Sequence, residues 1–134
     1  MNYETARKNL IEQHIRPWNV YRTDVIKSLY NVPRENFVPN KYKKYALSDL
    51  QVPLNGNDSM LNPMVEARVL QSALTKNCGE ILEIGCGSGY MAALLAQVYK
   101  SVITVEINQH LFEQASENFK SNNIDNVQVF LGDG

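Results

Sequence analysis

The spacing of apolar residues changes along the chain near Pro63. Before this proline, helical spacing is kept only over short stretches, as at Leu10, Ile11, His14 and Ile15. The apolar segment 50–54 contains Pro53 and precedes the turn-forming residues 55–58, so it predicts an extended lid rather than a central strand. Residues 1–62 are therefore predicted to form an N-terminal helical cap with a lid.

After Pro63, continuous apolar runs alternate with helical spacing. The runs at 80–84, 101–106 and 127–131 predict strands, the first of them buried. A helix is predicted before each of the three runs, and the first of these helices begins after Asn62. That helix is expected to bury an apolar stripe, which consists of Val65, Val69, Leu70, Ala73 and Leu74. The alternation predicts the α/β class, with a parallel sheet and right-handed crossovers.

The composition allows one hydrophobic core and excludes a strong attraction to polyanions. With 134 residues, of which 44% are hydrophobic, the chain is expected to fold as one unit. Its 13 basic and 14 acidic residues leave a net charge of -1, so neither nucleic acid nor a membrane is expected as a partner. The basic run at 41–45 is predicted to be a solvated helix face. A polar N-terminus and the lack of a long apolar run predict a cytoplasmic location.

The cysteines and histidines predict neither a metal site nor a catalytic pair. Cys78 and Cys86 lie outside any Cys-x-x-Cys or Cys/His spacing, so reduced thiols that bind no metal are expected. His14 and His110 lie singly on predicted helices, and neither is expected to be catalytic. Trp18 is expected to anchor the core rather than to form a substrate platform.

A glycine-rich turn follows the first predicted strand. Its glycines allow the backbone to approach a ligand, and free N–H groups are expected to face that ligand. Glycine loops also form plain tight turns, but a position between a strand and a helix favours a nucleotide-type cofactor site. The residues expected to contact the cofactor here are Glu83, Gly85, Cys86, Gly87, Ser88 and Gly89.

The charge of this turn discriminates between two classes of cofactor. A dinucleotide would place a doubly anionic pyrophosphate near the carboxylate of Glu83, which is unfavourable. S-adenosylmethionine has no phosphate and carries a sulfonium and an ammonium group, so an acidic neighbour favours it. The spacing G-x-G-x-G also differs from the dinucleotide pattern G-x-G-x-x-G, because Tyr90 occupies the position of the last glycine. The sequence therefore predicts S-adenosylmethionine.

Two further acidic residues follow the next two strands. Glu106 ends the second strand about twenty residues after the turn, where a carboxylate can accept hydrogen bonds from both ribose hydroxyls. Asp133 follows the third strand and is placed to meet an adenine edge. Ile107 and Gly132 are expected beside them at the cofactor. The alternative interpretations are a surface glutamate and a turn aspartate.

These motifs resemble those of Rossmann-type methyltransferases, whose motifs one, post-one and two match Glu83–Gly89, Val105-Glu106 and Gly132-Asp133-Gly134. The first half resembles one family in particular, the protein-L-isoaspartate O-methyltransferases. The matching residues are Val32-Pro33-Arg34-Glu35-Asn36-Phe37-Val38-Pro39, Ala46, Val52-Pro53-Leu54 and Pro63. The resemblance covers nearly the whole chain. It implies a Rossmann-like, three-layer αβα fold with strand order 3-2-1, of which residues 63–134 form the N-terminal half.

Membership of this family implies methylation of the carboxylate of isoaspartyl residues in damaged proteins, with S-adenosyl-L-homocysteine as the product. Aligned on the two prolines, Ser59 matches the family's threonine and is the residue expected to act at the acceptor. Leu61 replaces the serine expected to hold the acceptor carboxylate, and Asp58 would repel an anionic acceptor if it pointed inward. No general base is expected, because a carboxylate is already nucleophilic.

Two other functions remain open. Leu61 and Asp58 favour a methyltransferase-like module with a different acceptor, or one without catalytic activity. A nicotinamide oxidoreductase is disfavoured by Glu83.

The family continues past the Gly-Asp-Gly motif with further strands, whereas this chain ends there. The apolar strand at 81–84 is therefore expected to be an open edge of the sheet. Either the chain is a fragment of a longer protein, or a second copy is expected to cover this edge in a homodimer.

Overall fold

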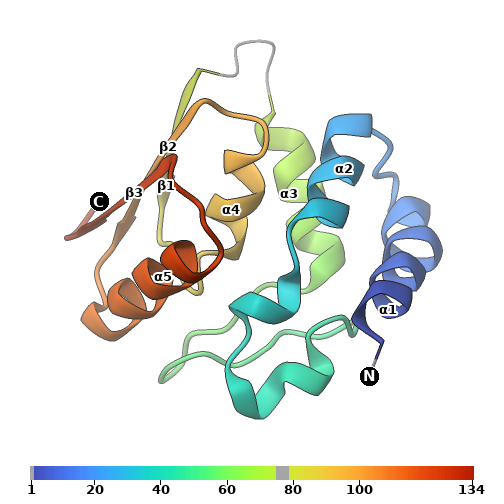
Figure 1. Cartoon of the computed structure of the whole chain (residues 1–134), viewed down its shortest axis with the longest axis horizontal. Helices are drawn as coiled ribbons and strands as arrows, with labels where there is room; N and C mark the ends of the chain where they lie inside the picture. Colours follow the sequence, from blue (N-terminus) through green and yellow to red (C-terminus); the bar gives the residue numbers. More distant parts are fainter. Residues whose placement is uncertain (1, 75–78) are drawn as a thin grey trace.

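The computed structural model describes residues 2–74 and 79–134, which form a helical cap and a three-stranded sheet with its helices (Figure 1). The cap consists of α1 (Tyr3–Leu10), η1 (Ile11–Ile15), η2 (Arg16–Trp18), α2 (Thr23–Asn31), η3 (Arg34–Phe37) and η4 (Asn40–Tyr45). The second part consists of α3 (Pro63–Ala73), β1 (Glu80–Ile84), α4 (Tyr90–Ala96), β2 (Ser101–Glu106), α5 (Gln109–Ser121) and β3 (Val127–Leu131). All three predicted strands are confirmed with the predicted bounds.

Asparagine caps fix where the helices next to the site begin. The Asn62 side chain accepts a hydrogen bond from the Met64 N–H at 3.0 Å, and α3 begins at the next residue, Pro63. The Asn108 side chain accepts one from the Leu111 N–H at 3.0 Å, so α5 begins directly after the end of β2. Such caps satisfy backbone donors that have no partner within the helix.

The three strands are parallel and lie in the order β1-β2-β3. Glu83 on β1 is aligned with Thr104 on β2, and Glu106 on β2 is aligned with Leu131 on β3. The carboxyl ends of the strands therefore meet at one edge of the sheet, where ligands of such folds bind. The predicted α/β class, parallel sheet and strand order are confirmed.

Helices cover one face of this sheet, and the other face is bare in the described part of the chain. Both α4 and α5 contact β2 and β3, and on their side Val102 and Thr104 are fully buried. On the opposite side Leu82 and Ile84 are each 60% exposed. The prediction that β1 is buried is therefore wrong. The prediction of an open edge is confirmed, because β1 pairs only with β2 among the described strands.

Two predictions about buried side chains are wrong. Trp18 is 53% exposed and does not anchor the core. In α3, Val65 and Val69 are exposed, because the helix buries a neighbouring face that includes Pro63, Met64, Glu66, Ala67 and Leu70. The helical spacing at residues 10–15 continues as a π-helix, η1, which buries Ile11 and Ile15 and leaves His14 exposed.

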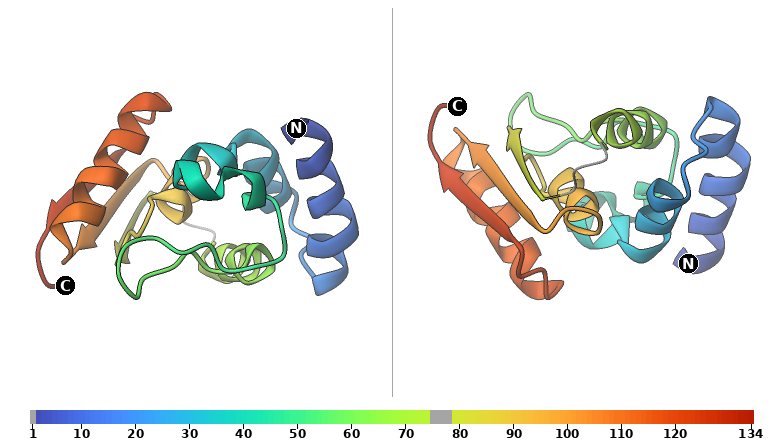
Figure 2. Two further views of the ribbon diagram at one scale, coloured as in Figure 1. Left: turned by 90° about the horizontal axis from the view of Figure 1, so that it is seen from below. Right: turned by 90° about the horizontal axis from the view of Figure 1, so that it is seen from above.

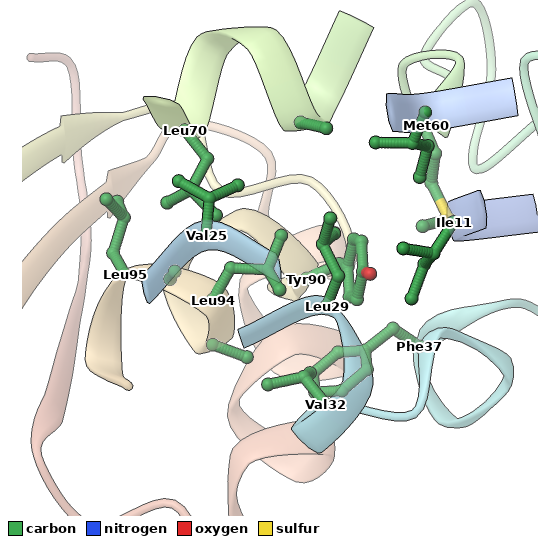
Figure 3. Close-up of a cluster of buried hydrophobic side chains, with 14 of the residues drawn as sticks. Ile11, Val25, Leu29, Val32, Phe37, Met60, Leu70, Tyr90, Leu94 and Leu95 are labelled. Carbon is green, nitrogen blue, oxygen red and sulfur yellow. The ribbon is translucent and has the colours of Figure 1, made fainter. Parts of the chain in front are cut away.

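One hydrophobic core joins the cap to the helices of the sheet (Figure 3). In this cluster Val25 and Leu29 of α2 lie against Leu94 of α4, and the side chain of Tyr90, the first residue of α4, lies beside Leu29. The views in Figure 2 place the cap on the side of α3 and α4 that is away from the sheet. Cap and sheet are therefore packed as one unit, and Met60 of the predicted lid belongs to the same core.

The remaining sequence features agree with a polar, solvated surface. Lys41 and Lys44 in η4 are exposed and lie over the rings of the adjacent tyrosines, which confirms a solvated helix face. In the part of the chain that the structure describes, no helix is long and apolar enough to span a membrane, and no cluster of three potential metal ligands occurs. The prediction about Cys78 lies outside the described residues, whereas Cys86 is buried and free.

Candidate cofactor and acceptor site

The turn between β1 and α4 requires glycine at its most crowded position. Gly85, Gly87 and Gly89 all have positive φ, of 84°, 53° and 92°. A Cβ atom on Gly89 would lie 2.8 Å from two ring carbons of Phe119 on α5. Gly89 therefore combines a backbone conformation that other residues rarely adopt with contact against a buried ring. The turn can approach α5 this closely because Gly89 has no side chain.

Glu106 holds the glycine turn in place. One carboxylate oxygen accepts hydrogen bonds from the N–H groups of Cys86 and Gly87, both at 3.1 Å, and the other accepts one from the Asn108 N–H at 2.9 Å. The side chain is only 5% exposed. The expectation that these turn N–H groups are free to bind a ligand is therefore wrong. The turn therefore offers a ligand the negative charge of Glu106, while the N–H groups of Cys86 and Gly87 are already bonded to that carboxylate. Such a turn is a poor binding site for a phosphate.

Glu83 lies one strand away from Glu106 and is held by Thr104. The Thr104 hydroxyl donates a hydrogen bond of 2.6 Å to the Glu83 carboxylate. Burial raises the pKa of Glu83 from 4.5 to about 7, the Thr104 hydrogen bond opposes this shift, and the charge of Glu106 adds to it. The two carboxyl groups therefore form an acidic pair at the carboxyl ends of β1 and β2, where a cation would relieve their repulsion.

The raised pKa of Glu83 predicts how stability depends on pH. The folded protein binds this proton more tightly than the unfolded chain, so the free energy of unfolding is expected to fall as pH rises from 4.5 to about 7. In Glu83→Gln this part of the pH dependence is expected to disappear, as measured by urea unfolding across that range. Glu80→Gln, an exposed position on the same strand, is the matched control. A Glu83→Gln variant with the wild-type pH profile would contradict this assignment.

The predicted lid folds over the glycine turn as a short hairpin of its own. We use the name lid segment for residues 52–62. Its Met60 N–H donates to the Val52 carbonyl at 2.7 Å, and its Leu54 N–H donates to the Asp58 carbonyl at 2.8 Å. Leu54 approaches the glycine turn, since its Cδ1 atom lies 3.3 Å from where a Cβ of Gly87 would be. The prediction that this segment is not a central strand is confirmed, because it lies outside the sheet and makes only an isolated antiparallel bridge between Pro53 and Ser59; its role as a lid stays a prediction.

A cavity of about 360 Å³ lies between the lid segment, α3 and the end of β1. Ser59, Leu61 and Glu83 line it, together with most of the glycine turn. Leu61, at the position of the family's serine, thus lines the cavity, whereas Asp58 is exposed and does not line it. Among the described lining residues, the ionisable groups are Glu66, Glu83, Cys86 and Tyr90, and none is basic. The cavity is suited in size to a small organic ligand and in charge to a cation.

Two of the predicted site residues lie on the surface. Asp133 is exposed, and Ile107 is 70% exposed, so neither lines the cavity. The Gly132 N–H donates to the backbone carbonyl of Glu106 at 2.9 Å, which brings the Gly-Asp-Gly motif beside the end of β2. Burial and the charge of Glu106 raise the pKa of Cys86 to about 12, so this residue is a neutral thiol and not a nucleophile.

Sequence reasoning missed a buried ion pair beside the cavity. Arg34 in η3 and Glu66 in α3 are 2% and 4% exposed, and the Arg34 Nε atom lies 3.1 Å from a Glu66 carboxylate oxygen. Burial raises the pKa of Glu66 to about 7, and the charge of Arg34 opposes this shift. The sequence offered two signals, an acidic residue at a helix position between apolar ones and the family-like motif that contains Arg34, and neither indicates that Arg34 and Glu66 form a pair.

Comparison with known proteins points to one family. The sequence model of the family described as protein-L-isoaspartate(D-aspartate) O-methyltransferase matches residues 5–134. A protein-L-isoaspartate O-methyltransferase of Herpetosiphon aurantiacus is 31% identical over 98% of this chain and 59% of its own length. Protein-L-isoaspartate O-methyltransferase 1 of Rhodopseudomonas palustris is 35% identical over 99% of this chain and 54% of its own length. The chain thus spans little more than half the length of these curated relatives.

Solved structures share the fold. A protein-L-isoaspartate O-methyltransferase that is 28% identical superposes on 96% of this chain and 42% of its own, with a TM-score of 0.80. A second protein, from Plasmodium falciparum, was solved in complex with S-adenosyl-L-homocysteine. It is 20% identical and covers 96% of this chain and 62% of its own, with a TM-score of 0.73.

Proposed function

Because the chain belongs to the protein-L-isoaspartate(D-aspartate) O-methyltransferase family, we propose that its protein transfers a methyl group from S-adenosylmethionine to the carboxylate of isoaspartyl residues in damaged proteins. The products are the methyl ester and S-adenosyl-L-homocysteine. The observation that carries the proposal is the cavity between the lid segment and an acidic glycine turn, in a chain that matches this family along nearly its whole length.

The residues of the turn suit the proposed cofactor. A carboxylate can accept about four hydrogen bonds, and three of those of Glu106 are taken by backbone N–H groups, which leaves room for a ribose hydroxyl on the oxygen that binds Asn108. Glu83 supplies negative charge for the sulfonium and ammonium groups. We assign cofactor contacts to Glu83, Gly85, Cys86, Gly87, Ser88, Gly89, Glu106, Ile107, Gly132 and Asp133. Ile107 and Asp133 lie outside the cavity, just past the ends of β2 and β3, so the adenosine end of the cofactor would have to extend out of the cavity to reach them.

Methyl transfer to a carboxylate requires alignment more than acid–base catalysis. The carboxylate oxygen attacks the methyl carbon while the bond to sulfur breaks, and no proton has to move. The protein must therefore hold the acceptor in line with the methyl group and exclude water. We assign the acceptor side to Ser59 of the lid segment. We also propose that residues 1–62 act as the cap and lid and that residues 63–134 form the cofactor-binding half.

Methyl transfer from tritium-labelled S-adenosylmethionine to a synthetic isoaspartyl peptide tests the proposal. Labelled ester is expected with the isoaspartyl peptide and not with the matched peptide that contains ordinary aspartate. Cofactor binding without transfer to any peptide would contradict the enzymatic assignment, and transfer only to another acceptor would contradict the substrate.

We further propose that a second copy of the chain covers the exposed face and edge of β1 in a cytoplasmic homodimer. The exposed apolar side chains on this side of the sheet include Leu82 and Ile84 of β1, each 60% exposed, and Phe130 of β3, which is 52% exposed. A contiguous exposed apolar surface favours association. Light scattering is expected to give the mass of a dimer, and a soluble monomer would contradict the proposal.

A further inference from the structure

The guanidinium group of Arg34 connects four separate segments of the chain. Its Nε atom pairs with Glu66 on α3, and its Nη1 atom donates a hydrogen bond to the Ala46 carbonyl at the end of the cap. Its Nη2 atom donates a hydrogen bond of 2.9 Å to the Leu61 carbonyl in the lid segment. The guanidinium carbon also lies 5.5 Å from the ring centre of Tyr90, the first residue of α4. All three nitrogens of the group are therefore used.

The contact with Tyr90 relates Arg34 to the glycine turn. Tyr90 follows Gly89 directly and is 4% exposed. Its ring also packs against Phe37 of η3, with ring centres 5.7 Å apart (Figure 3). Arg34 thus contacts both the residue that follows the glycine turn, Tyr90, and the lid segment, through the Leu61 carbonyl.

Residues 52–61 of the lid segment depend on Arg34 for their polar attachment to the fold, whereas Asn62 bonds separately to Asp49 and to the first turn of α3. Residues 52–61 make their backbone hydrogen bonds within the hairpin, as between Met60 and Val52. Among the described residues, the hydrogen bond from Arg34 to Leu61 is the one that joins residues 52–61 to the rest of the protein. The other attachments are the apolar contacts of side chains such as Val52 and Met60, which do not fix direction as a hydrogen bond does.

We propose that Arg34 is a positioning residue that sets the place of Ser59 and Leu61 over the glycine turn, and with it the alignment of the acceptor with the methyl donor. This inference rests on the proposed function. Arg34 does not line the cavity and touches neither ligand. It acts through the Leu61 carbonyl on one side and through Glu66, which does line the cavity, on the other.

Arg34→Lys tests this role. Lysine keeps the charge but is a compact donor that cannot reach three diverging acceptors in one plane. We expect kcat/KM for the isoaspartyl peptide to fall about tenfold to a hundredfold, the range for losing hydrogen bonds from a charged group. The dissociation constant of S-adenosyl-L-homocysteine, measured by calorimetry, is expected to change by less than about threefold, because the glycine turn stays bonded to Glu106.

Arg7→Lys is the matched control. Arg7 also forms a buried ion pair, with Glu35 in the cap, but among the described residues no hydrogen bond or ion pair joins it to the lid segment, and it does not line the cavity. We expect it to lower the melting temperature as Arg34→Lys does while leaving acceptor kinetics unchanged. Equal effects of the two variants on kcat/KM would overturn the inference. So would a loss of cofactor affinity in Arg34→Lys that matches its loss of activity, since both results describe a general loss of structure.

A second variant covers the case in which Arg34→Lys does not fold. Glu66→Gln keeps the shape of the side chain and removes the charge that holds the guanidinium, so acceptor kcat/KM is expected to fall, by less than in Arg34→Lys. Because Glu66 also lines the cavity, the dissociation constant of S-adenosyl-L-homocysteine is measured beside it, and a loss of affinity that matches the loss of kcat/KM would overturn the inference. Wild-type acceptor kinetics in a folded Glu66→Gln protein would overturn the inference. If the wild-type protein itself transfers no methyl group, the proposed function fails instead. Hydrogen exchange of residues 52–61, faster in Arg34→Lys than in Arg7→Lys, then still tests the attachment.

Discussion

Gly89→Ala is expected to cause the largest loss of cofactor binding of any single methyl group added to the chain. The added Cβ would lie 2.8 Å from the ring of Phe119, and alanine would have to adopt a φ near 92°. Left-handed strain and overpacking together are expected to lower the free energy of unfolding by roughly 2–4 kcal/mol. Displacement of the turn by about 1 Å is expected to cost about a hundredfold in productive cofactor binding. Urea unfolding and calorimetry with S-adenosyl-L-homocysteine measure the two effects.

Gly56→Ala separates strain from crowding. Gly56 also has a positive φ, of 63°, but nothing lies within 4 Å of the position of its added Cβ. Only the conformational cost of about 1 kcal/mol is expected there, with cofactor affinity retained. Equal losses in the two variants would show that contact with Phe119 does not hold the turn.

Glu106→Gln is expected to have the second-largest effect. An amide has one oxygen and one NH2 group, so at least one of the N–H groups of Cys86, Gly87 and Asn108 loses its acceptor. A buried donor without a partner costs about 1–3 kcal/mol, so the free energy of unfolding is expected to fall by that amount. Cofactor affinity is expected to fall by about tenfold or more, because the turn loses both its support and its negative charge.

Glu117→Gln, an exposed position on α5, is the control for Glu106→Gln. It is expected to leave both stability and cofactor affinity at wild-type values. Retained affinity in Glu106→Gln would mean that this carboxylate neither shapes the turn nor binds the cofactor.

The order and bounds of the strands could be predicted because each strand is a continuous apolar run with its own boundaries. The positions of the glycine turn and of Glu106 could likewise be predicted, because the turn begins directly after β1 and Glu106 is the last residue of β2. The errors concern which side of an element is buried. Val65 and Val69 have helical spacing, yet the face of α3 that is buried depends on where the cap lies, and the local pattern does not contain this information.

The polar contacts of the site were beyond prediction for a similar reason. The sequence shows that Glu106 ends a strand, but not that its carboxylate turns back onto backbone N–H groups nineteen and twenty residues earlier. The pair of Arg34 and Glu66 joins residues 32 positions apart and carries no periodicity. These contacts arise from tertiary packing. Because of them, the negative charge at the turn comes from Glu106 as well as from Glu83.

An acidic turn whose N–H groups are already bonded is expected to bind a cationic methyl donor and to reject phosphate. A calorimetric competition between S-adenosyl-L-homocysteine, which keeps the cofactor's ammonium group, and NADH measures this selectivity. S-adenosyl-L-homocysteine is expected to bind, and NADH is expected neither to bind nor to displace it. Tight NADH binding that excludes S-adenosyl-L-homocysteine would show that the charge of the turn does not select the cofactor.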